Sequence, residues 1–193
     1  MYTGSVSTRE RLIESTRTLL WERGYVATSP KTIQQLADAG QGSMYHHFSG
    51  KEELARVAID RTAEEMRASV DAVLSGPGTA LERIAAYLRR ERDVMKGCPI
   101  GRLTQDPDVM STPMLVAPVA ETLGWLRERL AALVAEGVAD GGLSPTLDPV
   151  TTAAAIVATL QGGYVLARAA NDPQAFQQAI EGVLALLGAP SVL

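Results

Sequence analysis

The sequence predicts an all-α protein with about nine helices. Leu, Ile and Ala recur along most of its 193 residues at intervals of three and four, which is the spacing of one helix face. No stretch of the sequence alternates apolar and polar residues as a half-buried strand does. Segments rich in Gly, Pro and Asp, above all 75–79 and 140–149, separate the apolar runs and are typical of turns.

Three helices, the second and third of them short, are expected near the N-terminus. The residues "STRE" from Ser7 have the spacing of a capping box, so a first helix is expected to start there. Ser29-Pro30 predicts a second start, because Ser caps helix N-termini and Pro is favoured at the first helical position. A turn over 38–40 leads to a third helix over about 41–48.

The rest of the chain predicts longer helices. A second capping-box spacing, "SGKE" from Ser49, indicates a long helix that runs to about Leu74. Pro118 is expected to kink or restart the helix that contains it, because proline has no backbone N–H to donate. The later apolar runs predict helices over about 80–96, 115–133, 151–170 and 175–187, and the segment 97–108 is expected to be irregular.

Composition limits the class of protein. Hydrophobic residues make up 46% of the chain, enough to form a buried core. We find no run of about 18 apolar residues and no apolar signal segment, so we expect no membrane span and a cytoplasmic location. Cys98 is the single cysteine, which excludes an intrachain disulfide and fits a reducing compartment.

Charge is distributed unevenly along the chain. Residues 1–56 contain seven Lys or Arg and six Asp or Glu, whereas residues 57–193 contain eleven and sixteen. The first segment therefore has a net charge of +1 and the second a net charge of −5. A more basic N-terminal part is a mild indication of an anionic partner there. We predict two domains, over 1–50 and 51–193.

The second and third short helices, joined by a tight turn and preceded by another helix, fit a helix-turn-helix motif. The second helix of such a motif enters the major groove of DNA. On this hypothesis Lys51 neutralises a phosphate, Gly42 lets the backbone approach DNA, and Phe48 fills the core of the head. The side chains expected to contact DNA are Gln41, Ser43, Met44, Tyr45, His46 and His47; Gln41, Ser43 and His46 are candidates for base edges, and Tyr45 and His47 for phosphates.

The segment "ATSPKTIQQLADAGQGSMYHHFSGKEEL" (27–54) resembles the DNA-binding head of TetR-type, that is tetracycline-repressor-like, transcriptional regulators. The Ala-Thr-Ser entry, the Gly-Ser-x-Tyr-His-His-Phe segment and the following Lys-Glu-x-Leu match the family pattern without gaps, and "GCPIGRL" (97–103) is similar to one branch. We include Ser29 and Lys31 among the expected DNA contacts. Asp38 departs from the family, where glycine is usual, although Asp also accepts a left-handed turn.

The resemblance implies a ligand-responsive transcriptional repressor. Such a protein binds a palindromic operator in double-stranded DNA as a homodimer joined by its last two long helices, with recognition helices about 34–36 Å apart. A small, apolar effector is then expected among the helices of residues 54–165. Its binding moves the helix that starts at Lys51, and it has to bind the released state more tightly.

Met and aromatic residues of the body are candidates for lining an effector cavity, because Met adapts to irregular shapes. Ordinary core packing is the alternative for each of them. Arg102 is a candidate partner for a ligand anion, and Cys98 for redox sensing, although such a cysteine is more often a small buried hydrophobe. The candidate set is Met66, Tyr87, Met95, Cys98, Arg102, Met110, Met114, Trp125, Gln161 and Tyr164.

Gly162 and Gly163 lie inside an apolar helix, where each glycine costs about 1 kcal/mol of helix stability. Close approach of another helix, at a contact between subunits, would explain them; a local kink is the alternative. The candidate dimer interface consists of Leu160, Gly162, Gly163, Phe176, Ile180, Val183 and Leu184.

Other functions have weaker support in the sequence. The adjacent His46 and His47 would point about 100° apart on a helix, and the sequence holds no third histidine, so we expect no metal and no cofactor. No phosphate-binding glycine loop, zinc motif or nucleophile–base pair indicates an enzyme. The alternative function is an all-α small-molecule sensor or interaction module without DNA binding, which the charge of Asp38 favours.

Overall fold

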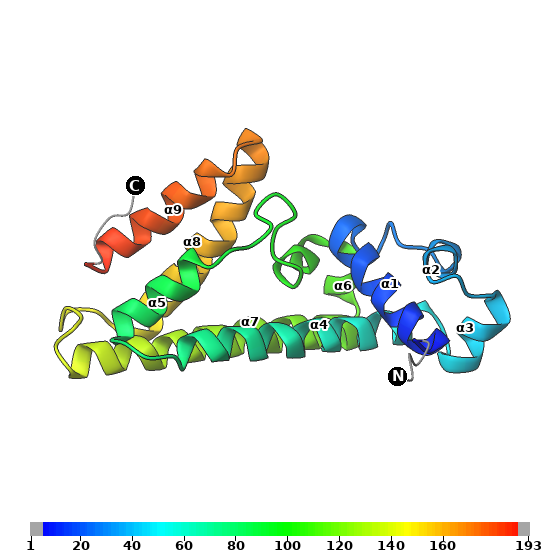
Figure 1. Cartoon of the computed structure of the whole chain (residues 1–193), viewed down its shortest axis with the longest axis horizontal. Coiled ribbons are helices and arrows are strands. Elements are labelled where there is room, and N and C mark those ends of the chain that lie inside the picture. Colours follow the sequence, from blue (N-terminus) through cyan, green and yellow to red (C-terminus); the bar gives the residue numbers. More distant parts are fainter. Residues whose placement is uncertain (1–5, 189–193) are drawn as a thin grey trace, which may run out of the picture. The chain divides into compact units, whose positions relative to one another are not determined.

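The computed structural model describes residues 6–188, and within them the backbone forms nine α-helices and one 3-10 helix. In chain order these are α1 (Thr8–Arg23), α2 (Pro30–Leu36), α3 (Gln41–His47), α4 (Lys51–Leu74), α5 (Ala80–Arg89), η1 (Gly101–Gln105), α6 (Pro107–Ser111), α7 (Pro113–Ala139), α8 (Pro149–Ala170) and α9 (Gln174–Leu186) (Figure 1). None of the described residues forms a strand. The all-α prediction is confirmed.

Residue contacts divide the chain into two compact units. The first unit contains the residues up to Glu65 together with Pro99–Glu121, and the second contains Met66–Cys98 together with the residues from Thr122 onward. α4 and α7 each contribute to both units. The predicted boundary after residue 50 separates a DNA-binding domain from an effector-binding domain by function, not by packing. It stays a prediction.

Polar side chains fix the starts of the N-terminal helices. The hydroxyl groups of Ser7 and Ser29 cap α1 and α2, as the sequence predicts. At α4 the partner differs from the prediction, because Glu53 rather than Glu52 accepts hydrogen bonds from the backbone N–H and the hydroxyl of Ser49, both at 2.7 Å. The hydrogen bond from the Ser49 backbone N–H, and after it the one from the Ser49 hydroxyl, lower the pKa of Glu53.

α5 is shorter than the predicted range 80–96 and ends at Arg89. The guanidinium of Arg92 turns back and donates to the carbonyl oxygen of Tyr87 and, at 3.1 Å, to that of Leu88. These are carbonyls of the last turn, which have no partner within the helix itself. A polar side chain beyond the helix therefore satisfies its C-terminus, which apolar periodicity cannot indicate.

α7 runs through Pro118 without a break, so the predicted restart of the helix is wrong, and the predicted kink stays a prediction. Proline lacks the N–H that would donate to the carbonyl four residues earlier, which is that of Met114. The Met114 carbonyl instead accepts a hydrogen bond of 2.9 Å from the guanidinium of Arg56 on α4. A side chain of a neighbouring helix thus replaces the backbone bond that proline removes.

α8 has the length and composition of a membrane-crossing helix, with a mean hydropathy of 1.4 over its most apolar stretch, although the sequence analysis found no such run. Its buried residues include Ile156, Leu160 and Tyr164. α8 packs along α9. A helix that buries one side against a neighbour in this way is also typical of a protein core.

Substitutions can test whether Arg56 replaces the backbone hydrogen bond that Pro118 removes. Arg56→Met should lower the free energy of unfolding in urea by about 0.5–1.5 kcal/mol, because a hydrogen bond to a backbone carbonyl is lost. The cost should shrink in a Pro118→Ala background, where the backbone N–H is restored. Asp60→Asn controls for the simultaneous loss of the Arg56–Asp60 ion pair, which measures 2.7 Å. Equal costs in both backgrounds would contradict the explanation.

Candidate DNA interface

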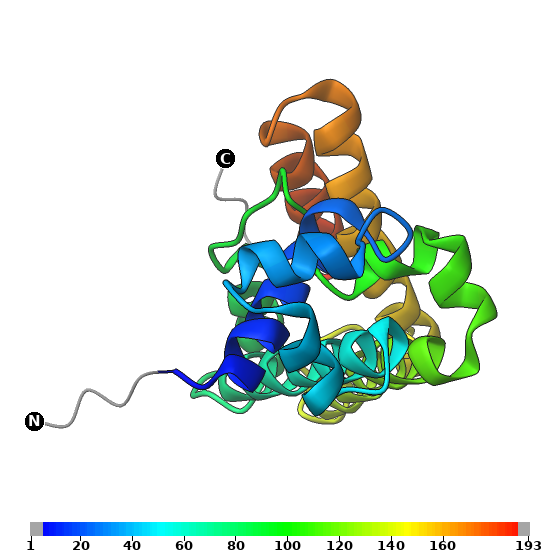
Figure 2. The same cartoon turned by 90° about the vertical axis from the view of Figure 1, so that its right-hand side faces the viewer.

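α1, α2 and α3 pack against one another in the first unit (Figure 2). Apolar side chains from all three helices and from the start of α4 meet between them. The buried residues of this core include Leu12, Ile13, Leu20, Ile33, Ala37, Met44, Phe48 and Leu54. The expected role of Phe48 in this core is confirmed, since its side chain is 2% exposed.

The turn between α2 and α3 is fixed from α1. Asp38 adopts a left-handed conformation with φ 47°, which residues other than glycine seldom adopt. Arg11 on α1 donates from Nε to the carbonyl of Ala37 at 2.8 Å and from Nη2 to that of Asp38 at 3.1 Å. The carboxylate of Asp38 is exposed, so its negative charge lies at the surface. The turn thus keeps its shape without a glycine, as the sequence analysis expected.

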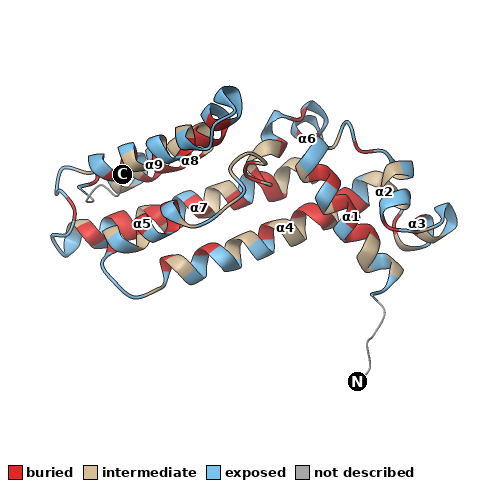
Figure 3. Cartoon of the chain, turned by 45° about the horizontal axis from the view of Figure 1, so that its top comes forward, coloured by how far each residue is buried: buried red, intermediate tan, exposed pale blue. Residues whose placement is uncertain are grey.

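α3 has one buried and one exposed side. Met44 is fully buried and Phe48, four residues later, lies on the same side of the chain. The prediction that Met44 contacts DNA is therefore wrong, because this side chain anchors α3 to the head. Ser29 and Lys31, near the start of α2, are exposed. The exposed residues of α3 are Gln41, Gly42, Tyr45 and His46, with Ser43 and His47 half-buried (Figure 3).

The two histidines lie at the C-terminal end of α3. Their ring centroids are 5.0 Å apart, with the rings edge to face. The ring of His47 also contacts that of Phe48 edge to face, at 6.4 Å. Among residues 6–188, no group of three His, Cys, Asp or Glu side chains is placed to hold a metal ion.

Lys51 has a partner within the protein. Its ammonium group lies 3.7 Å from the centroid of the Tyr25 ring and donates to the Tyr25 carbonyl at 2.7 Å. Burial lowers the pKa of Lys51, and two nearby aspartates oppose that shift. The predicted partner of this ammonium is a DNA phosphate; in the structure one of its three N–H donors already holds the loop between α1 and α2.

Asp106 connects the same loop to the start of α6. Its Oδ2 atom accepts from the backbone N–H of Tyr25 at 2.6 Å and of Val26 at 3.0 Å. Its Oδ1 atom accepts from the N–H of Asp108 at 3.1 Å and of Val109 at 3.2 Å. The side chain is only 8% exposed. Four backbone N–H groups thus stabilise one buried carboxylate, and the carboxylate fixes both segments.

Two further residues complete this contact. Arg102 on η1 donates to the carbonyl oxygens of Trp21 and Glu22, at the C-terminus of α1, where a cation also complements the helix dipole. The structure gives Arg102 these partners in place of the predicted ligand. Gly24 has φ 80°, and a Cβ atom there would lie 2.8 Å from Oδ2 of Asp106. The segment 97–108, expected to be irregular, contains η1 and the start of α6 and holds the end of α1.

The anchoring role of Asp106 was not predicted from the sequence. The local signal is the dipeptide Asp106-Pro107, which is typical of a helix start; in the structure Asp106 caps α6, a helix that was not predicted. Its partners Tyr25 and Val26 lie about 80 residues earlier, and nothing in the spacing of the sequence connects them.

The predicted ligand-binding residues are not brought together in one place. Arg102, Met110 and Met114 belong to the first unit, and the two methionines are 48% and 45% exposed. The other candidates belong to the second unit, where Tyr87, Cys98 and Tyr164 are buried and Met66, Met95, Trp125 and Gln161 are half-buried. A pocket in the second unit is lined by different residues, at the end of α5 and on α9.

Most of the predicted dimer-interface residues are buried inside the protomer, so their assignment needs correction. Leu160, Gly163, Phe176, Ile180, Val183 and Leu184 are buried, with α8 packed against α9. A Cβ atom on Gly163 would lie 2.9 Å from the Phe176 ring, whereas one on Gly162 would meet nothing within 4 Å. Other apolar side chains of these helices are exposed: Val165 at 51%, Leu166 at 55% and Leu186 at 85%.

Comparison with known proteins extends over both units. Residues 12–58 match the family "Bacterial regulatory proteins, tetR family", and residues 78–183 match "Tetracyclin repressor-like, C-terminal domain". An uncharacterized HTH-type transcriptional regulator of Mycobacterium tuberculosis is 29% identical over 171 residues, which covers 85% of this chain and 86% of that protein.

Solved structures show the same fold. A TetR transcriptional regulator from Chloroflexus aurantiacus has a TM-score of 0.79 and 28% identity, covering 94% of each chain. The reduced form of Escherichia coli NemR has a TM-score of 0.84 and 21% identity, covering 96% of this chain and all of that one.

Removal of the Asp106 carboxylate should destabilise the first unit. Asp106→Ala leaves buried N–H groups without an acceptor, each of which costs about 1–3 kcal/mol, so the free energy of unfolding should fall by at least about 2 kcal/mol. Asp108→Ala removes the same charge from an exposed neighbour and should change it by less than about 0.5 kcal/mol. Chemical denaturation of both variants measures the difference, and similar costs would refute the role of Asp106.

Proposed function

Because the chain belongs to the tetR family of bacterial regulatory proteins, we propose that it represses transcription as a homodimer on a palindromic operator and is released by a small effector. The exposed side of α3 is the observation that carries this proposal. A solvent-facing polar helix, anchored by Met44 behind a rigid turn, is the arrangement that enters a major groove. The protein acts by binding, without catalysis, in the cytoplasm.

We assign the DNA contacts by exposure. Gln41, Ser43 and His46 are proposed to contact base edges, which carry the sequence information of the major groove. The proposed phosphate contacts are Ser29, Lys31, Tyr45 and His47, with Lys51 adding positive charge from the loop contact that it makes. A Cβ atom on Gly42 would meet no atom of the protomer within 4 Å, so this glycine leaves room for a partner rather than for its own fold.

We propose that two copies associate through the exposed sides of α8 and α9. Val165 and Leu166 on α8 and Leu186 on α9 expose large apolar side chains that the protomer does not cover. Gly162 lies on α8 away from the buried α8–α9 contact, where it permits another helix to approach. We take these exposed apolar side chains as the candidates for the contact between two copies.

A second candidate function is a sensor or interaction module that does not bind DNA. It is favoured by the exposed carboxylate of Asp38, which would lie near phosphates in the proposed complex. A gel shift with DNA flanking the protein's own gene distinguishes the two functions, since only a repressor retards that DNA at low protein concentration.

The proposed DNA contacts make distinguishable predictions. Gln41→Ala should weaken operator binding by about 1–3 kcal/mol and leave binding to random duplex nearly unchanged, because a base contact is lost. Lys31→Ala should weaken both and reduce the slope of log affinity against log salt by about one. Fluorescence anisotropy over a range of salt concentrations measures both effects, with the exposed Arg127→Ala on α7 as control. If neither variant differs from Arg127→Ala, α3 is not the DNA contact.

The proposed dimer interface can be tested by charge. Leu166→Asp places a carboxylate in the apolar contact, where its desolvation is unfavourable, so light scattering at micromolar concentration should show a monomer. Met110→Asp makes the same kind of change at an exposed position, 48% accessible, on α6 in the first unit, and should remain dimeric. A wild-type protein that is itself monomeric at this concentration would contradict the operator model as well.

A further inference from the structure

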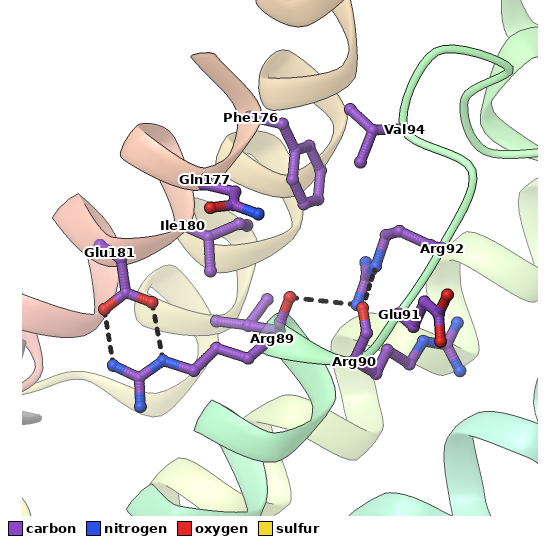
Figure 4. A pocket seen from close by; sticks show the side chains of 10 residues that line it. Arg89, Arg90, Glu91, Arg92, Val94, Phe176, Gln177, Ile180 and Glu181 are labelled. Carbon is purple, nitrogen blue, oxygen red and sulfur yellow. Dashed lines mark hydrogen bonds and ion pairs between the residues drawn. The ribbon is translucent and has the colours of Figure 1, made fainter. Parts of the chain in front are cut away.

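A pocket of about 320 Å³ lies between α9 and the segment that ends α5 (Figure 4). We call it the α5–α9 pocket; residues 88–92 and Val94 line one side, and Phe176, Gln177, Ile180 and Glu181 line the other. All of them belong to the second unit. The volume falls at the lower end of the range for small-molecule sites, about 300–1,000 Å³. The pocket contains none of the ligand-binding residues that the sequence analysis predicted.

One part of the pocket is apolar and held in place. Leu88, Phe176 and Ile180 are each at most 4% exposed. The Phe176 ring lies 4.7 Å from the ring of Tyr164, measured between centroids, with an angle of 34° between the planes. Gly163 also packs against the Phe176 ring, and the Arg92 guanidinium lies 5.4 Å from the ring centroid. Phe176 therefore forms a fixed apolar wall of the pocket beside a cation.

Three arginines lie at the pocket, and one of them has a carboxylate partner. Arg89 donates to Glu181 from Nε at 2.7 Å and from Nη2 at 2.6 Å, a two-point pair in which the charges offset each other. This pair raises the pKa of Arg89. It closes one end of the pocket (Figure 4) and leaves the other two arginines to set the charge there.

Arg92 is bound by neutral oxygens only. It donates to the carbonyls of Tyr87, Leu88 and Arg90, and to the hydroxyl of Tyr164 at 3.3 Å. Burial raises the pKa of Tyr164, so this hydroxyl stays uncharged near neutral pH. These bonds occupy four of the five N–H donors of a guanidinium, while its positive charge has no anionic partner among the described residues.

Arg90 adds a second charge of the same sign. Its guanidinium lies 5.0 Å from the Tyr87 ring centroid and donates to the hydroxyl of Ser69 at 3.3 Å, so its partners are also neutral. Glu91, the remaining acid of the lining, is exposed, and water screens its charge. The pocket therefore combines a rigid apolar face with an excess of positive charge.

We propose that the α5–α9 pocket binds a small amphipathic carboxylate. Its apolar ring or chain lies against Phe176 and Ile180, and its carboxylate accepts the remaining N–H of Arg92 in the positive potential that Arg90 reinforces. A carboxylate is the group that supplies the missing charge and matches the planar guanidinium. This corrects the expectation of a purely apolar effector.

The proposal rests on the proposed function, because it names the chemical class of the effector. Along the chain, residues 95–98 join the pocket lining to the segment that Asp106 fastens to the α1–α2 loop. A ligand held between α5 and α9 restrains one end of this connection. It favours release from DNA if it binds the released state more tightly.

Two matched probes test the ligand class on the full-length protein. Isothermal titration calorimetry compares 2-naphthoate with 2-naphthalenemethanol, which has the same rings and no charge. We expect 2-naphthoate to bind at least about tenfold more tightly, since a hydrogen bond to a charged group contributes about that factor or more. Arg92→Gln should remove this preference and leave the affinity for the alcohol unchanged.

Further variants distinguish a loss of ligand binding from a folding defect. Arg90→Gln leaves the Arg92 cap of α5 in place and should weaken 2-naphthoate binding by a smaller factor than Arg92→Gln. Arg127→Gln removes an exposed charge outside the pocket and should have no effect. Equal affinities for the two probes, no 2-naphthoate binding at millimolar concentration, or an affinity unchanged by both pocket variants would overturn the proposal.

DNA release is measured separately, by fluorescence anisotropy of labelled DNA flanking the gene. Release by 2-naphthoate in the wild type and not in Arg92→Gln supports both the pocket and the proposed function. Arginine-dependent binding that leaves the DNA complex intact supports the pocket and its ligand class, and contradicts the ligand response in the proposed function.

Discussion

The buried carboxylate of Asp106 is the constraint on which the DNA-binding unit depends. It fixes the loop that leads into α2 and the first turn of α6 through the same two oxygen atoms. Because buried N–H groups without an acceptor cost about 1–3 kcal/mol each, neither segment moves alone without a penalty. Gly24 follows from this constraint, since a side chain there would meet the carboxylate. The loop that leads into α2 is thus fixed by a residue far along the chain.

The helix-turn-helix could be predicted from sequence because its signals are local. Ser29-Pro30 starts α2, and the tolerance of Asp38 for a left-handed turn is a property of that residue alone. The direction in which α3 faces is not local. Seven residues hold about two helical turns, and either side of "QGSMYHH" could be apolar enough to pack. Only the core of the other helices decides that Met44 is inside, which is why its predicted role failed.

For the C-terminal helices, the sequence pattern located each helix but did not show which side is buried. Their positions were predicted within a few residues, but the buried and exposed sides were confused. α8 carries apolar residues on both, with Leu160 and Tyr164 buried and Val165 and Leu166 exposed. Periodicity identifies a core side only when the other side is polar. The two glycines also lie on different sides of α8: Gly163 packs against α9, and Gly162 faces away from it. Association of two copies requires apolar residues beyond those that the core of one protomer buries.

Arg92 both ends α5 and adds positive charge to the α5–α9 pocket. Its guanidinium satisfies the last carbonyls of α5 and so ends that helix before residue 90, against the apolar pattern. The same guanidinium brings positive charge into the α5–α9 pocket without an acid to offset it. A bound anion therefore acts on the group that determines where α5 ends. From that point the chain leads into the segment held by Asp106. The end of one helix, the charge of a pocket and the anchor of the DNA-binding unit thus follow one another along a single stretch of the chain.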